Sequence, residues 1–122
     1  MPEGVFIARD VNEDLDSVFI EASNDEGLSL GSLLAHFDRS QSEYEIGLVG
    51  VNDGNERQGI GSALVACATE HAKELGSQVI TSELVTEAGV GLMTKLFGEE
   101  SVVSLSERNY DGSNRSLLYH KL

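Results

Sequence analysis

The chain has 122 residues, of which 40% are hydrophobic and 24% are charged, and this composition predicts one folded domain rather than a disordered chain. Twenty-one acidic residues against eight Lys and Arg give a net charge of −13, so the basic stripe of a duplex nucleic-acid binder is absent. The sequence also lacks a membrane-length apolar run, the pattern of a secretory leader and a second cysteine for a disulfide. We therefore expect a single cytoplasmic domain over 1–122 that binds neither nucleic acid nor membrane.

The acidic excess has more than one interpretation. An acidic surface attracts cations, so it would steer a substrate that carries an amine toward the protein. The carboxylates could equally form a solvated surface or reflect adaptation to high salt. The sequence leaves these alternatives open.

Apolar runs separated by turn signals predict strands in the first half of the chain, at 4–9, 18–22, 28–37 and 43–51. Together these strands predict an antiparallel meander. The spacing of Leu15, Val18 and Ala22 also fits an amphipathic helix with Asn12 as its cap. We favour a hairpin because this apolar run leads straight into a turn and a further strand.

Helical periodicity begins after the fourth run. Apolar residues recur at steps of three and four from Ile60 to Leu75, and Gly76 stands where a helix end is expected. The rest of the chain predicts a strand at 79–85, a second helix at 87–97 and closing strands at 102–105 and 117–119. Strands followed by alternating helices and strands predict a mixed α/β domain.

The segment between the fourth strand and the first helix contains Gly59 and Gly61. Glycine lets a ligand approach the backbone, and the amides of a first helical turn lack partners within the helix and carry partial positive charge. This combination suits a phosphate or pyrophosphate, to which Arg57 would add charge and Ser62 a hydroxyl donor. Leu64 occupies the third glycine position of the dinucleotide fingerprint and no Gly-Lys-Ser/Thr follows, so neither that site nor a P-loop is predicted.

The run Val51-Asn52-Asp53-Gly54-Asn55-Glu56-Arg57-Gln58-Gly59-Ile60-Gly61-Ser62-Ala63-Leu64-Val65 resembles motif A of the GNAT superfamily of N-acetyltransferases. That motif is a strand ending in Val, a loop, and then Arg/Gln-x-x-Gly-x-Gly/Ala at the start of a helix. The order of the surrounding elements is similar too, over about 18–122. The resemblance implies a GNAT-like fold with a central, mostly antiparallel twisted sheet, a meander of the second to fourth strands, the motif-A helix, one further helix, and N-terminal helices that are reduced or absent.

The resemblance also implies acetyl-CoA, or another acyl-CoA, as cosubstrate, and acyl transfer to an amine of a small molecule or peptide. The pantetheine arm would run along the fourth strand, and the pyrophosphate would bind to backbone amides. The implied cofactor-binding residues are Val49 and Val51 along the arm, and Arg57, Gln58, Gly59, Ile60, Gly61 and Ser62 around the pyrophosphate.

The sequence departs from the family pattern at positions that matter for catalysis. Glu56 stands where the family usually has Arg or Gln, and Met93 stands where its general-acid tyrosine is usual. These departures keep open a catalytically inactive GNAT-fold module that binds acyl-CoA or a protein partner. A homodimer could complete the acceptor cleft. A different nucleotide-binding α/β protein is a third alternative, which requires a parallel sheet.

Glu45 is the candidate general base. It falls where some superfamily members place a base glutamate, and strand alternation predicts that it shares a face with Val49 and Val51. Its alternative role is a solvated strand charge. Glu83, on the strand after the first helix, is a further candidate base.

Tyr110 and Tyr119 are candidates for the acid that protonates the leaving thiolate. Tyr110 could equally be a surface residue, and Tyr119 a core residue. The three histidines do not fall at metal-binding spacing with carboxylates, so no metal site is predicted.

Overall fold

The computed structural model describes residues 4–52, 59–110, 112 and 114–122. In chain order the elements within these residues are β1 (Phe6–Asn12), β2 (Ser17–Ser23), β3 (Ser29–Asp38), β4 (Glu43–Val51), α1 (Ile60–Glu74), β5 (Val79–Leu84), α2 (Glu87–Phe97), the short 3-10 helix η1 (Glu99–Ser101), β6 (Val102–Arg108) and β7 (Asn114–Lys121). Each predicted helix and strand is present, with ends that differ by a few residues.

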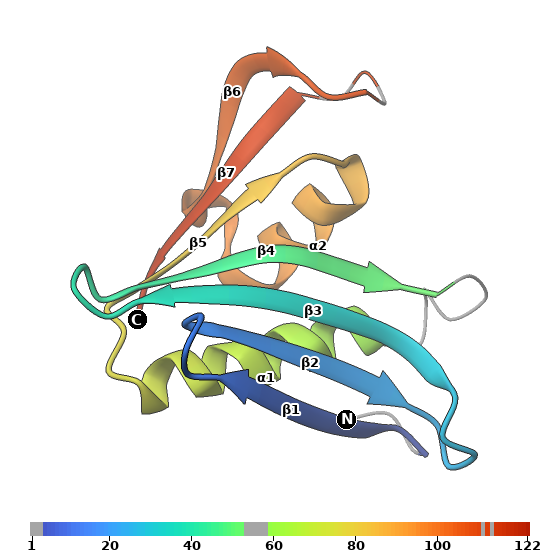
Figure 1. Cartoon of the computed structure of the whole chain (residues 1–122). Coiled ribbons are helices and arrows are strands. Elements are labelled where there is room, and N and C mark those ends of the chain that lie inside the picture. The colour runs from blue at the N-terminus through green and yellow to red at the C-terminus, as the bar shows by residue number, and fades with distance from the viewer. Residues whose placement is uncertain (1–3, 53–58, 111, 113) are drawn as a thin grey trace.

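The strands form one sheet in the order β1-β2-β3-β4-β5-β7-β6 (Figure 1). β4 and β5 pair in parallel, whereas the other neighbouring strands pair antiparallel. The predicted mixed α/β class and mostly antiparallel sheet are thus confirmed. Because an antiparallel meander leads into α1, the alternative of a nucleotide-binding protein with a parallel sheet is wrong.

A hairpin, and no helix, occupies residues 6–23. β1 and β2 pair along their whole length. The side-chain oxygen of Asn12 accepts hydrogen bonds from the amides of Asp14 and Leu15 at 3.1 and 3.2 Å. Asn12 therefore stabilises the turn between two strands rather than the start of a helix, as asparagine often does. The predicted hairpin is confirmed, and the alternative helix is wrong.

Both helices pack on one face of the sheet (Figure 1), α1 against β1–β4 and α2 against β5–β7. The core lies between this face and the helices. Alternate strand residues are buried there, among them Ile20, Leu33 and Ile80, each at most 1% exposed. Within the described ranges no helix packs on the opposite face, which we call the open face.

A β-bulge interrupts β4 at Gly47. Leu34 pairs with Leu48, but the next residue of β3, Ala35, pairs with Ile46. Gly47 is therefore an extra residue on β4 with no partner on β3. Such an insertion shifts the alternation of side chains along the bulged strand by one position.

The bulge separates the candidate base from the candidate cofactor strand. Before the bulge, the buried Ile46 faces α1. After it, Val49 and Val51 pack against the core on that same face. Glu45 is exposed on the open face. The prediction that Glu45 shares a face with Val49 and Val51 is therefore wrong, because the period of two is broken between them.

Gly31 on β3 lies where backbones approach closely. A Cβ atom there would lie 2.7 Å from the carbonyl oxygen of Gly50 and 3.2 Å from Cγ2 of Ile60. We expect Gly31→Ala to destabilise the fold by about 1–3 kcal/mol through overpacking, measured by urea unfolding. Gly50→Ala is the control, because a Cβ at Gly50 meets nothing within 4 Å. Equal stabilities of the two variants would contradict this packing.

Candidate functional site

A cleft opens where β4 and β5 diverge. The two strands pair only between Glu43–Glu45 and Val79–Thr81, and they separate beyond these residues (Figure 1). The cleft has a volume of about 490 Å³ and is enclosed by both strands, the first turn of α1 and one side of α2. Its lining residues are 47–49, 51, 59, 61, 62, 82–86, 88, 89, 92, 93 and 95.

The first turn of α1 presents unpaired amides to this cleft. Gly59 precedes the helix with φ of 75°, a left-handed conformation that favours glycine, and no side chain caps the helix. The amide of Ala63 is the first to bond within the helix, to the carbonyl of Gly59 at 3.0 Å. The amides of Ile60, Gly61 and Ser62 thus lack intrahelical partners. The first turn contains no acidic residue, so its partial positive charge is not neutralised from within the helix.

Backbone amides and carbonyls at the edge of β4 also point toward the cleft. The amide of Asn52 donates to the carbonyl of Leu30 at 2.9 Å, so these residues form a hydrogen-bonded pair. Such pairs alternate with non-hydrogen-bonded pairs along an antiparallel ladder, and the register continues unbroken to Leu48. The amides and carbonyls of Val49 and Val51 therefore point away from β3 and toward β5, which does not pair with them in the described part of the chain.

Close packing of the two helices shapes the base of the cleft. A Cβ atom at Gly61 would lie 3.3 Å from Cδ2 of Leu92 and 3.7 Å from Cγ2 of Val51. Met93 is 2% exposed and forms part of the wall. Ile60 is fully buried in the core and is not among the residues that line the cleft, whereas its neighbours Gly59, Gly61 and Ser62 are.

Two candidate catalytic residues lie in one row on the open face. Glu45 pairs with Thr81, and Thr81 pairs with Tyr119. Adjacent strands are about 4.8 Å apart, which places Glu45 and Tyr119 roughly 10 Å apart across Thr81. Tyr119 is 50% exposed, so its alternative role as a core residue is wrong.

The other predicted site residues are distributed as follows. Tyr110 is fully exposed after β6 and does not line the cleft. Arg57 and Gln58, together with Glu56, lie outside the described residues. Five of the candidate cofactor-binding residues line the cleft: Val49, Val51, Gly59, Gly61 and Ser62.

The sequence of the chain matches a known protein family over most of its length. The model of the Acetyltransferase (GNAT) family matches residues 3–98. The chain belongs to the GNAT family. No curated protein matches its sequence.

Solved structures share the GNAT fold over nearly the whole chain. A putative acyl-CoA N-acyltransferase from Klebsiella pneumoniae is 12% identical, with a TM-score of 0.75 over 97% of both chains. A GNAT family acetyltransferase from Elizabethkingia anophelis with acetyl-CoA bound is 13% identical, with a TM-score of 0.72 over 98% of this chain and 99% of that one. The ribosomal-protein-S18-alanine N-acetyltransferase from Escherichia coli is 14% identical, with a TM-score of 0.72 over 96% and 93% of the two chains. At these identities the likeness shows the fold alone.

Two residues that shape the GNAT cleft, Ser82 on β5 and Thr86 just after it, were not predicted to do so from the sequence. The Ser82 hydroxyl donates to the carbonyl of Ile46 at 2.6 Å, next to the point where β4 and β5 diverge. Thr86 caps α2 by accepting a hydrogen bond from the amide of Gly89 at 3.1 Å. The cap had a sequence signal, a threonine at the start of a predicted helix. The role of Ser82 had none, because it depends on β4 being the neighbour of β5.

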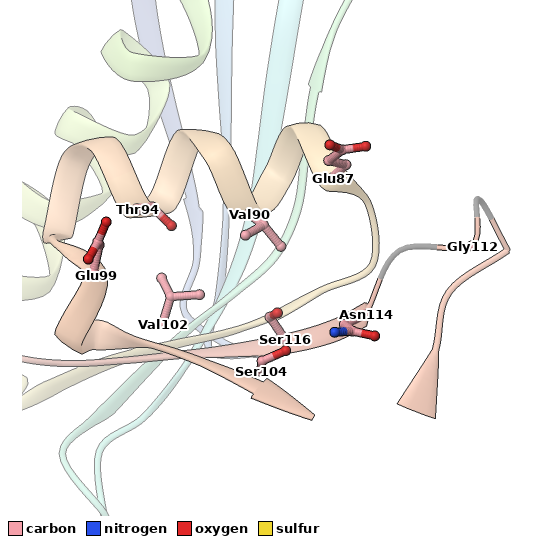
Figure 2. A pocket seen from close by; sticks show the side chains of 9 residues that line it. All are labelled: Glu87, Val90, Thr94, Glu99, Val102, Ser104, Gly112, Asn114 and Ser116. Atoms are coloured by element: carbon pink, nitrogen blue, oxygen red, sulfur yellow. The ribbon is translucent and has the colours of Figure 1, made fainter. Parts of the chain in front are cut away.

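A second hollow, of about 580 Å³, lies between α2, β6 and β7. Figure 2 shows Glu87 and Glu99 toward its two ends and Ser104 and Ser116 on the strands that line it. The two carboxylates would repel a phosphate. The first turn of α1 does not line this hollow. The cleft between β4 and β5 is therefore the better candidate for an anion site in this GNAT chain.

Tyr44 and His71 form a polar pair within the core. The Tyr44 hydroxyl lies 3.0 Å from Nδ1 of His71. Burial lowers the pKa of His71, and the nearby Arg9 guanidinium lowers this pKa further. Burial raises the pKa of Tyr44. Both side chains are thus held neutral near pH 7, and because neither lines the cleft, their role is structural.

None of the helices in the described ranges is long and apolar enough to cross a membrane.

Proposed function

We propose that this chain is an N-acyltransferase that takes an acyl group from acetyl-CoA, or a related acyl-CoA, and transfers it to an amine of a small molecule or peptide. One observation carries the proposal: the unpaired amides of the first turn of α1 and the free edge of β4 line the same cleft. One end of the cleft suits an anion, and the other suits an extended chain that pairs with a strand.

The anionic end supports the binding of a pyrophosphate. Three amides, from Ile60 to Ser62, carry the partial positive charge of the helix start, roughly +0.5 of an elementary charge. The net charge of −13 opposes an anion at long range. Screening over about 8 Å at physiological salt weakens that repulsion, whereas contact hydrogen bonds survive.

The edge of β4 supports the binding of a pantetheine arm. Val49 and Val51 direct their backbone amides and carbonyls away from β3. A ligand that lies along this edge of β4, in the place of a neighbouring strand, can form hydrogen bonds with them. The facing wall contains the apolar Leu92 and Met93, which would pack against the methylene groups of such an arm.

The acyl-CoA supplies an activated thioester. A new carbon–nitrogen bond forms as the carbon–sulfur bond breaks, the amine loses a proton to a base, and the thiolate takes one up. Glu45 is our candidate for the base, reached directly or through one water. Tyr119, across Thr81 in the same row, is the candidate acid. Tyr110 is a second candidate acid, from the turn before β7. Met93 cannot donate a proton.

Thermal unfolding with and without acetyl-CoA tests the binding step. At a concentration of about 100 times Kd, the ligand should add about 2.7 kcal/mol to the free energy of unfolding. Pantetheine without its phosphates should stabilise the chain far less at the same concentration, because it leaves the α1 amides without an anion. An unchanged melting temperature at millimolar acetyl-CoA would contradict the proposed function.

A further inference from the structure

The open face carries an exposed apolar strip. Phe19 on β2 pairs with Leu34 on β3, which pairs with Leu48 on β4. Their side chains are 43%, 38% and 66% exposed. At about 4.8 Å between strands, the three side chains form a strip roughly 10 Å long across the sheet. Contiguous exposed apolar side chains of this kind mark interaction sites.

The connectivity explains why this strip is bare. A sheet normally buries an apolar face against a second layer. β1 ends at Asn12 and β2 begins at Ser17, so the chain turns back between them and provides no segment that would lie across the open face. α1 and α2 both pack on the other side.

Carboxylates border the strip. Asp10 on β1 pairs with Phe19 and borders one end of the strip. Glu21 lies two residues from Phe19 on the same face of β2. Beyond the strip, an open hollow of about 520 Å³ is lined by Glu43 and Glu45 of β4 and by Asp16, Asp38, His36 and Leu15.

The charges of the open face select the kind of partner. On β7, Arg115 and Lys121 lie on this face, and Arg115 pairs with Glu107 at 3.4 Å. At the hollow, Nε of Arg39 lies 4.0 Å from Oδ1 of Asp16, which leaves the other carboxylates there in excess. An acidic border around an apolar strip complements a segment that is both apolar and basic. A second copy of the chain would bring another net charge of −13 and the same acidic border, which disfavours it.

We propose that the open face binds a cationic amphipathic peptide segment of another protein, and that this segment carries the acceptor amine, an inference that rests on the proposed function. Leu48, at one end of the strip, also lines the cleft between β4 and β5. Glu45 lies on the same face of β4, across the bulge from Leu48. A lysine next to the apolar anchor of the peptide would therefore reach the candidate base from the side opposite the α1 amides.

Binding of a fluorescein-labelled amphipathic peptide of leucine, lysine and alanine, followed by fluorescence anisotropy without acyl-CoA, tests the docking step. The double variant Phe19→Thr/Leu34→Thr should weaken binding by about tenfold or more, because it removes the anchors of the strip. Phe19→Leu should bind as the parent does. Leu28→Thr is the matched control, since Leu28 is 61% exposed in the β2–β3 turn and lies off the strip. A peptide with glutamate in place of lysine should not bind.

Two results would overturn this inference. One is equal affinity of the double variant and the parent for the peptide. The other is a dimer in sedimentation that the double variant abolishes, because a second copy would then occupy the face. The melting shift with acetyl-CoA is measured on the same double variant and should equal that of the parent. Peptide binding without any acetyl-CoA shift in the parent would contradict the proposed function while leaving the docking surface in place.

Discussion

Replacing Ser62 with Glu is expected to weaken acyl-CoA binding by at least about a hundredfold without weakening the fold. Ser62 is the third residue of α1, and its amide and side chain border the cleft. A carboxylate in the first turn of a helix is favourable by about 0.3–1 kcal/mol, and the third position is where a glutamate completes a capping box. The same carboxylate would stand next to the phosphates of the ligand. Two unit charges at 4 Å repel by about 4 kcal/mol at the effective dielectric of a protein surface.

Ser62→Glu separates folding from binding, because it is expected to leave the stability of the free chain equal or slightly higher and to lower its affinity for acyl-CoA. Urea unfolding without ligand should show equal or slightly higher stability, whereas calorimetry with acetyl-CoA should show affinity lower by at least about a hundredfold. Ala66→Glu is the control, because Ala66 is exposed on the same helix and does not line the cleft. Equal affinity of Ser62→Glu and the parent for acetyl-CoA would place the phosphates elsewhere.

Glu45→Gln is expected to lower kcat/KM for acyl transfer by about 10²–10⁴-fold, the usual contribution of a general base. Acetyl-CoA binding should not change, because Glu45 lies on the open face and does not line the cleft. Raising the pH should restore part of the rate, since a larger fraction of the acceptor amine is then already deprotonated. Release of free CoA across a panel of amines measures the reaction.

Glu43→Gln serves as the control for Glu45→Gln. Glu43 is also on β4 and accepts a hydrogen bond from the Thr81 hydroxyl at 2.8 Å, which an amide oxygen can still accept. We expect its rate to stay near that of the parent. An unchanged rate in Glu45→Gln would remove Glu45 as the base and turn attention to Glu83, which lines the cleft. No turnover in the parent, with acetyl-CoA binding intact, would favour the inactive module.

Local patterns predicted most of the fold. The periodicity from Ile60 to Leu75 depends on neighbours within one helix, and α1 occupies 60–74. The candidate anion site can be predicted for the same reason, because glycines and unpaired amides at a helix start are local features, and anion binding there stays a prediction. The resemblance to the family implied N-terminal helices that are reduced or absent, and a hairpin with a short turn joins β1 and β2. These features need no knowledge of which strands lie side by side.

What the sequence could not predict depends on distant parts of the chain. Gly47 carries no signal that distinguishes a bulge from an ordinary strand glycine, yet the bulge moves Glu45 to the face opposite Val49. The row of Glu45, Thr81 and Tyr119 exists only because β5 lies between β4 and β7. Tyr119 could therefore be assigned neither to the surface nor to the core from its own strand.

Amide chemical shifts of the nitrogen-15-labelled chain, titrated with CoA, would show whether the first turn of α1 and the edge of β4 bind the cofactor. We expect the largest shifts at Ile60, Gly61 and Ser62, which would hold the phosphates, and smaller ones at Val49 and Val51 along the β4 edge. Shifts confined to the hollow between α2, β6 and β7, or no shifts at millimolar CoA, would contradict cofactor binding there.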